Sequence, residues 1–144
     1  MEDATLAQLD WVMASVHTSF DKDPTERVLN AMQSPHVDCI GHLTSRRIGV
    51  RNPSTIEVEK VVERAVETGT FLEINSQPDR LDLRDANARL AGEAGLRLVI
   101  SSDGHSTNAL RYVDLGVAQA RRAWLTKEQI LNTRQWKEIE KLRK

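Results

Sequence analysis

Four short apolar runs divide the 144-residue chain and limit what it can fold into: WVMASV (11–16), VDCIG (37–41), FLEIN (71–75) and LRLVIS (96–101). The runs are rich in β-branched residues and nearly continuous, without the alternation of a strand that has one solvated face. Strands that are covered on both faces have this composition, and they occur in parallel sheets. The runs therefore predict a parallel β-sheet enclosed by other elements.

Helical patterns of apolar residues lie between the runs, at 24–33, 53–69 and 84–95, and two more helices are expected at about 107–121 and 126–143. The runs start at 11, 37, 71 and 96, which gives spacings of 26, 34 and 25 residues. Such spacings fit a strand followed by a crossover helix. The chain is thus predicted to be an α/β protein of about four βα units. A closed eight-unit barrel needs roughly 250 residues, so the alternatives are a small open doubly wound sheet and part of a barrel.

The balance of charge argues against a general polyanion binder. The chain has 20 Lys and Arg against 21 Asp and Glu, a net charge of −1, so nucleic-acid contact would need a local patch. Cys39 is the only cysteine, which predicts no disulfide framework and favours a reducing cytoplasm. No apolar run approaches a membrane-spanning length, so no membrane association is expected. Residues 1–144 are expected to form one domain.

Polar side chains follow three of the four predicted strands at the point where each strand ends. His17 follows the first run, His42 the second, and the pair Asp103 and His105 the fourth. Because the carboxyl ends of parallel strands meet at one edge of a sheet, we expect these side chains to lie close together. His36, the remaining histidine, precedes its strand and is assigned to a surface turn at the opposite end.

Imidazoles and a carboxylate at one rim are ligands for Zn, Mn or Fe, so the sequence predicts a site for divalent metal ions held by His17, His42, Asp103 and His105. Each residue also has an ordinary explanation. A histidine at a strand end can bond to the backbone, and Asp103 can cap a helix that begins near Thr107. The coincidence of four such residues at one rim favours the metal site.

Two further polar residues lie inside the third run. Glu73 and Asn75 alternate with Leu72 and Ile74, so the two pairs should point to opposite faces of the sheet. A buried charge is costly unless it is paired, and we expect Glu73 and Asn75 to face the polar rim, where they support or join the ligands. The alternative is a carboxylate at a strand edge that pairs with an arginine.

Arginines lie close to the predicted site in sequence. Arg46 and Arg47 follow His42 by four and five residues. An arginine beside a metal cluster suits a phosphate oxygen, so Arg46 is predicted to act in catalysis, although a solvated loop arginine fits as well. Arg80 has the same two interpretations.

The chain resembles the PHP (polymerase and histidinol phosphatase) family over about residues 6 to 135. The resemblance rests on these stretches, in family order: ASVHTSF, VDCIGHLTSR, LEINSQPDRLDL, LVISSDGHS and GVAQARRAWLTKEQILNT. The stretches PDRLDL and ARRAWL are most similar to the PHP module at the C-terminus of bacterial family X DNA polymerases. The motifs then imply ligand roles for His17, His42, Asp103 and His105, with Arg46 as the arginine after the GH stretch.

The resemblance implies a distorted (βα)7 barrel with up to three metal ions. The family's opening H-x-H pair, and the histidine and glutamate that follow it, are missing here, which implies that residues 1–144 are the C-terminal portion of a PHP domain. The loop GHLTSR also departs from the family's GHPTGR at Leu43 and Ser45. About half of the ligand set is present, so no single ion would be fully coordinated.

The resemblance further implies a metal-dependent phosphoesterase, with 3′–5′ exonuclease or DNA-end-processing activity in the polymerase branch. Mn or Zn is the expected metal, with Fe as a third choice, and DNA or another phosphoester is the expected substrate. The chain alone is expected to be weakly active or inactive without the N-terminal half of the barrel. A non-catalytic structural or DNA-positioning module and a histidinol-phosphatase-like enzyme are the alternatives. Open strand edges at both ends of a partial sheet predict self-association.

Overall fold

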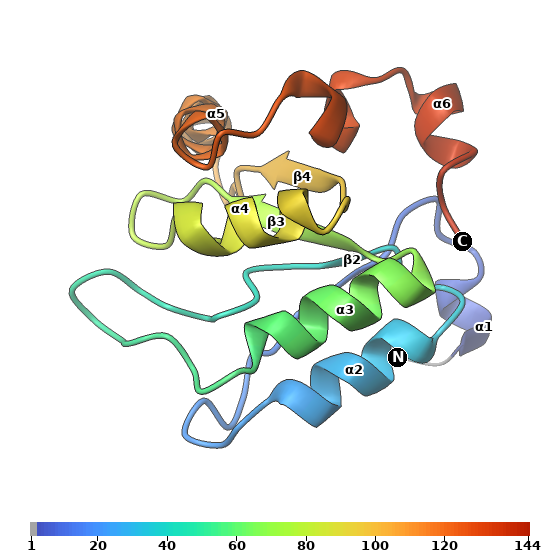
Figure 1. Ribbon diagram of the computed structural model, residues 1–144, viewed down its shortest axis with the longest axis horizontal. Helices are drawn as coiled ribbons and strands as arrows, with labels where there is room; N and C mark the ends of the chain where they lie inside the picture. Colours follow the sequence, from blue (N-terminus) through green and yellow to red (C-terminus); the bar gives the residue numbers. More distant parts are fainter. Residues whose placement is uncertain (1–2) are drawn as a thin grey trace.

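The computed structural model describes residues 3–144 and has four parallel strands in one sheet (Figure 1). The strands lie side by side in sequence order, β1-β2-β3-β4, and every neighbouring pair is parallel. They are β1 (Met13–Ala14), β2 (Cys39–Ile40), β3 (Phe71–Asn75) and β4 (Leu98–Ser101). The predicted α/β class and parallel sheet are confirmed.

One short helix precedes β1, three helices connect successive strands, and further helical segments follow β4. They are α1 (Asp3–Leu6), α2 (Thr25–Gln33), α3 (Val58–Thr68), α4 (Asp85–Glu93), η1 (Thr107–Tyr112), α5 (Val113–Arg122), η2 (Lys127–Gln129), η3 (Leu131–Thr133) and α6 (Trp136–Glu140). Gly69, with φ 67°, ends α3 in the left-handed conformation that glycine adopts without strain. The helical pattern predicted from residue 53 begins only at Val58. The helix predicted at 126–143 is instead three short segments.

The strand order distinguishes between the two predicted architectures. A doubly wound sheet reverses its strand order at a switch point and carries helices on both faces. Here the order never reverses, and α2 packs on α3, α3 on α4, and α4 on α5 (Figure 1). This connectivity is consistent with part of a βα barrel.

The two faces of the sheet bury different residues. Leu72, Ile74 and Leu98 are fully buried in a cluster with α2, α3 and α4, and each such burial contributes roughly 1.5–3 kcal/mol. Phe71 and Val99 belong to a second cluster that includes side chains of η3 and α6. Strand alternation thus separates an apolar helix side from a second face, and α6 covers only part of that face.

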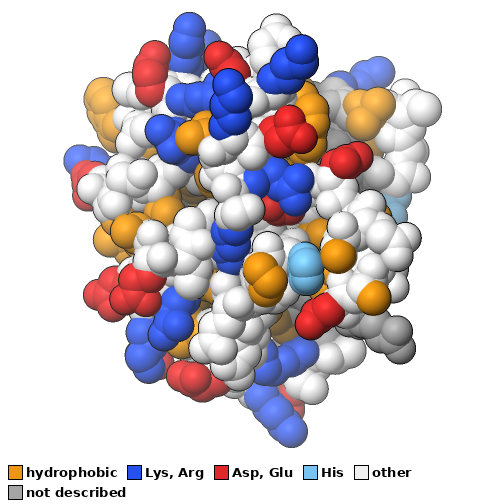
Figure 2. All heavy atoms as spheres, turned by 90° about the vertical axis from the view of Figure 1, so that its right-hand side faces the viewer, with side chains coloured by type: hydrophobic (Ala, Val, Ile, Leu, Met, Phe, Trp, Pro, Cys, Tyr) orange, Lys and Arg blue, Asp and Glu red, His pale blue; other side chains and the backbone are white. Residues whose placement is uncertain are grey.

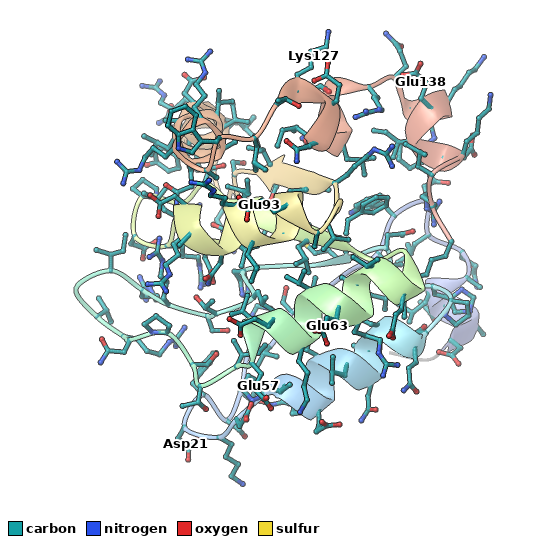
Figure 3. All side chains as sticks on the ribbon, in the orientation of Figure 1. Asp21, Glu57, Glu63, Glu93, Lys127 and Glu138 are labelled. Atoms are coloured by element: carbon teal, nitrogen blue, oxygen red, sulfur yellow. The ribbon has the colours of Figure 1, made fainter. Side chains whose placement is uncertain are left out.

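The outer surfaces of the helices and the surroundings of α6 are solvent-facing. Glu63 on α3 and Glu93 on α4 are exposed and point away from the sheet (Figure 3). On the face that includes α6 and the chain end, basic and acidic side chains are interspersed (Figure 2). Within residues 3–144, no helix has the length and apolar character needed to span a bilayer.

The free edge of β4 is covered, contrary to the prediction of exposed edges at both ends. Ile130 forms a parallel bridge with Leu98. The side-chain amide of Asn132 donates to the carbonyl oxygen of Ile100 (2.7 Å) and its Oδ1 accepts from the Ile100 N–H (3.1 Å). Because residues 130–132 bond to the edge of the sheet, the continuous helix predicted at 126–143 does not form. At the other end, among residues 3–144, β1 pairs only with β2.

An ion pair holds the end of the chain next to the residues that precede β1 and β2. The guanidinium of Arg143 donates to both carboxylate oxygens of Asp38 (2.7 and 3.2 Å). Asp38, which is 2 % exposed, also accepts a hydrogen bond from the Val12 N–H (2.8 Å). One carboxylate therefore joins the end of the chain to the start of β1.

Candidate functional site

Two histidines lie together at the carboxyl ends of β1 and β2. The rings of His17 and His42 are perpendicular, with centroids 5.0 Å apart. His42 is buried and has a backbone φ of 29°, whereas His17 is exposed. His17 and His42, which follow β1 and β2 along the chain, therefore meet at the rim. Their positions after two parallel strands predicted this meeting.

Two buried side chains of β3 connect this rim to the loop after β4. Glu73 accepts a hydrogen bond from the backbone N–H of His42 (2.5 Å) and another from the Ser101 hydroxyl. The amide of Asn75 donates to Glu73 (3.2 Å) and to Asp103 (3.1 Å). Neither Glu73 nor Asn75 is more than 2 % exposed, so these two side chains are shielded from water. Both residues point away from the helix side, as the alternation predicted.

Asp103 and His105 diverge after β4. Asp103 turns toward the network and accepts from Asn75, and its carboxylate lies 3.4 Å from Nε of Arg80. The side chain of His105 is 88 % exposed, and its Nδ1 lies 2.8 Å from the carbonyl oxygen of Asp103. The structure therefore brings His17, His42 and Asp103 to one region and leaves the ring of His105 in solvent.

The guanidinium of Arg46 is engaged by the backbone. Its Nε donates to the carbonyl oxygen of Arg80 (2.6 Å), and a second nitrogen donates to that of Leu81. Arg80 is instead the arginine that faces a predicted ligand, through its contact with Asp103. Arg46 thus positions the segment that carries Arg80, a relation between residues 34 apart that the sequence could not indicate.

Asp82 is a second buried carboxylate beside the rim, and the sequence analysis did not identify it. It is fully buried, and it accepts hydrogen bonds from the N–H and the hydroxyl of Thr44 (2.9 Å each). Its backbone pairs with Asn75 and returns the 76–82 loop along β3. The only sequence feature that could have indicated a buried Asp82 is its position between two leucines in PDRLDL.

Burial sets the electrostatics of the rim. Burial lowers the pKa of the His42 imidazole, and the Arg80 guanidinium lowers it further. Desolvation also raises the pKa of Glu73, although its hydrogen bonds from Ser101 and His42 oppose the change. A neutral imidazole is the form that binds metals.

His17 and His42 are the two side chains at the rim that could offer nitrogen donors to a metal ion. Nδ1 of His42 is buried and has no hydrogen-bond partner among the described residues, and His17 lies edge-on to the same ring. This pair suits a shared cation. Across residues 3–144, however, no three His, Cys, Asp or Glu side chains converge as a metal-binding group. The described residues therefore offer two imidazoles side by side and no group of three donors.

Comparison with known proteins places the chain among relatives that are named for phosphoester chemistry. No family model matches the chain. It is 39 % identical over 142 residues to the DNA polymerase/3′-5′ exonuclease PolX of Bacillus subtilis (strain 168), covering 96 % of the chain and 25 % of that protein. It is 30 % identical over 146 residues to a probable phosphatase of Thermoanaerobacter sp. (strain X514), covering 92 % of the chain and 57 % of the phosphatase.

A probable phosphatase of Shewanella sp. (strain ANA-3) is 32 % identical over 139 residues, which cover 88 % of the chain and 52 % of that protein. The chain is thus homologous to a polymerase-exonuclease and to probable phosphatases, in agreement with a PHP-type protein. It spans a quarter of the first relative and little more than half of the phosphatases.

Proposed function

We propose that residues 1–144 are the C-terminal part of a PHP-type, metal-dependent phosphoesterase domain of a family X DNA polymerase. In the full protein this domain acts in 3′–5′ exonuclease or DNA-end-processing reactions on DNA in the cytoplasm. The observation that carries the proposal is the meeting of His17, His42 and Asp103 at one rim, backed by the buried Glu73–Asn75 network. The relatives' names support the reaction class.

The proposal assigns His17, His42, Asp103 and His105 as ligands for divalent ions, Mn or Zn before Fe. A bound divalent cation would supply charge neutralisation and activation of water for attack on a phosphoester. Glu73 holds the backbone of His42, and Asn75 holds Asp103, so both residues fix ligand positions. The remaining ligands and strands come from an N-terminal half of the barrel, which pairs with the free edge of β1.

Restoring the upstream half tests this function. A longer protein that includes the preceding barrel strands is expected to bind Mn and to hydrolyse bis(p-nitrophenyl) phosphate, whereas the 144-residue chain shows weak activity or none. Asp103→Asn in the longer protein should abolish hydrolysis and reduce the metal content measured by mass spectrometry. Asp114→Asn, a change of one exposed carboxylate on α5, is the matched control. Strong hydrolysis by the 144-residue chain that His17→Ala abolishes would refute the fragment proposal.

Two alternatives have an observation of their own. The lack of a three-donor group in the described chain favours a structural or DNA-positioning module. That reading gains support if the longer protein holds no metal and Asp103→Asn leaves DNA processing unchanged. The relatives named as probable phosphatases favour a small-molecule phosphatase like histidinol phosphatase. Faster turnover of phosphomonoesters than of DNA ends would establish it.

A further inference from the structure

Exposed apolar side chains follow one another along η1 and α5, and α5 lies at the edge of the molecule (Figure 1). η1 continues into α5 without a break, because Tyr112 and Val113 both have helical backbone angles. Leu110 is 63 % exposed, and Val113 and Val117 are each 38 % exposed. Trp124, the second residue after α5, is 79 % exposed. We call these four apolar residues the α5 stripe.

The spacing of the α5 stripe is that of a seam between two helices. Three of its members lie seven positions apart, at 110, 117 and 124, and Val113 lies three positions after the first. Apolar residues at such spacings share one flank of a helix and pack against a second helix. Gly116 and Ala120, on the adjoining flank, are buried against the rest of the chain. The stripe therefore lies where the buried face of α5 meets solvent.

Two opposite charges lie beside the stripe on the same helix. Asp114 and Arg121 are seven residues apart, so they share a flank at a separation of about 10 Å, which is too long for an ion pair. Both are exposed, and within residues 3–144 neither side chain has an ionic partner, whereas Arg122 pairs with Asp85 (2.9 Å). Each charge is therefore available to a group outside the chain.

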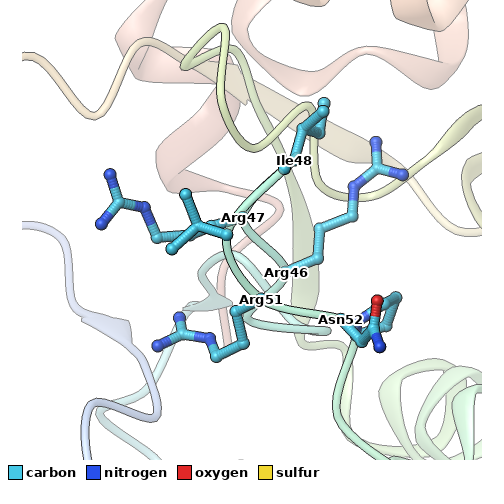
Figure 4. A pocket seen from close by; sticks show the side chains of 8 residues that line it. Arg46, Arg47, Ile48, Arg51 and Asn52 are labelled. Atoms are coloured by element: carbon cyan, nitrogen blue, oxygen red, sulfur yellow. The ribbon is translucent and has the colours of Figure 1, made fainter.

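Arg121 differs in this respect from the arginines beside the candidate site. The guanidiniums of Arg46, Arg47 and Arg51, which line the hollow of about 360 Å³ in Figure 4, are held by other groups of the chain. That hollow offers little unengaged charge to a ligand. The α5 stripe combines exposed apolar surface with two charges that have no ionic partner in the described chain.

The stripe and its two charges are complementary to a second copy of themselves. When two α5 helices pack antiparallel about a two-fold axis near Val117, Asp114 of each copy faces Arg121 of the other. The same register brings the two Val117 side chains together at the axis and places Leu110 of one copy toward Trp124 of the other. A parallel pair would instead place like charges opposite each other. The charges therefore favour the antiparallel arrangement.

We propose that the α5 stripe is a surface on which two copies of this chain associate, as an antiparallel helix pair with two symmetric Asp114–Arg121 ion pairs. Exposed ion pairs contribute little affinity, so they set the register while the apolar residues supply most of the binding. The stripe is short, and the expected pair is a transient one. The inference goes beyond the proposed phosphoesterase function, because the stripe includes none of the candidate ligands.

Exchange of the two charges tests the pairing. Sedimentation equilibrium of the 144-residue chain, at concentrations up to about 1 mM, measures the dissociation constant. Asp114→Arg places arginines opposite each other, and Arg121→Asp places carboxylates opposite each other, so each variant should raise the dissociation constant about tenfold. The double variant should restore the wild-type value. A 1:1 mixture of the two single variants should associate more tightly than either alone, because both contacts again join opposite charges.

Matched variants on α3 are the controls. Glu63→Arg makes the same change of charge on an exposed residue that points away from the sheet (Figure 3), and it should change the dissociation constant less than about twofold. Val117→Ser should weaken association about tenfold, since both copies lose apolar contact at the axis, whereas Val66→Ser, at a half-exposed position of α3, should not. Because the exchanged charges oppose the helix dipole, thermal melting checks that each variant is folded.

Three results would overturn the proposal. A wild-type chain that stays monomeric over the whole range would leave the stripe to a different protein. Association that the α5 variants do not change would place the contact elsewhere, such as at the uncovered edge of β1. A mixture of the single variants that associates no more tightly than either one would exclude the two-fold register. Hydrolysis by the longer protein tests the phosphoesterase function separately.

Discussion

Replacing Arg143 with methionine tests whether the chain end stabilises the whole sheet. Arg143→Met keeps the length of the side chain and removes the guanidinium that donates to both oxygens of Asp38. The carboxylate is 2 % exposed, and its single remaining donor is the Val12 N–H. We therefore expect a large destabilisation, because a buried charge would lose its partner.

Removing one member of a fully buried ion pair costs about 3–5 kcal/mol. The Arg143 side chain is still 21 % exposed, so water reaches part of the pair and the lower end of this range applies. We expect Arg143→Met to lower the free energy of unfolding by about 3 kcal/mol, which corresponds to a fall of roughly 10 °C in Tm for a chain of this size. Urea denaturation followed by circular dichroism measures the change, with an unaltered slope against urea.

The pairwise contribution is isolated by a double-mutant cycle. Asp38→Asn retains an oxygen that can accept from Val12 and leaves no buried charge, so on that background Arg143→Met should cost less than about 1 kcal/mol. Lys141→Met is the matched control, since it removes one exposed positive charge from the same segment. An equal cost of Arg143→Met on both backgrounds, or a cost within about 0.5 kcal/mol of Lys141→Met, would refute the reasoning.

Three further outcomes are expected. Burial raises the pKa of Asp82 in the folded chain, so the folded chain holds this proton more tightly than the unfolded chain, and the contribution of Asp82 to stability falls as pH rises above about 4. Asp82→Asn should therefore gain stability relative to wild type between pH 4 and 7, measured by urea titration. A gain that is constant with pH would contradict this. Asn132→Ala removes both bonds to Ile100 and should cost about 1–3 kcal/mol and increase self-association in sedimentation velocity; an unchanged monomer of wild-type stability would contradict it. Gly116→Ala places a methyl group against Oγ of Ser76 and should lower the free energy of unfolding by about 1–3 kcal/mol; an unchanged free energy of unfolding would contradict this.

The fold could be anticipated where the signal was local and periodic. Continuous apolar runs indicated parallel strands, and the alternation in FLEIN placed Glu73 and Asn75 opposite Leu72 and Ile74. The strand-end positions of His17 and His42 predicted their meeting, because parallel strands share one carboxyl edge. These conclusions needed only the regular geometry of strands.

The remaining features depend on contacts between distant residues or on irregular backbone. His105 follows Asp103 and Gly104, where φ of Asp103 is 48°, so a spacing of two no longer fixes where the side chain points. Arg46 is held by carbonyl oxygens that lie 34 and 35 residues later. The segment 126–143 has a helical composition, yet it does not form one helix, and the side chain of Asn132 bonds to the backbone of Ile100 in β4. In each case tertiary contacts override a local preference.

The two edges of the sheet differ, because the edge of β4 is covered and that of β1 is not. Open-ended growth by strand addition needs two free edges on every copy, one to donate and one to receive. Within the described residues β1 has a neighbouring strand on one side only, whereas Ile130 and Asn132 bond to the outer side of β4. A chain that lacks the upstream strands could therefore add one further copy at β1, and such a pair would offer no second uncovered β1 edge for growth into a fibre.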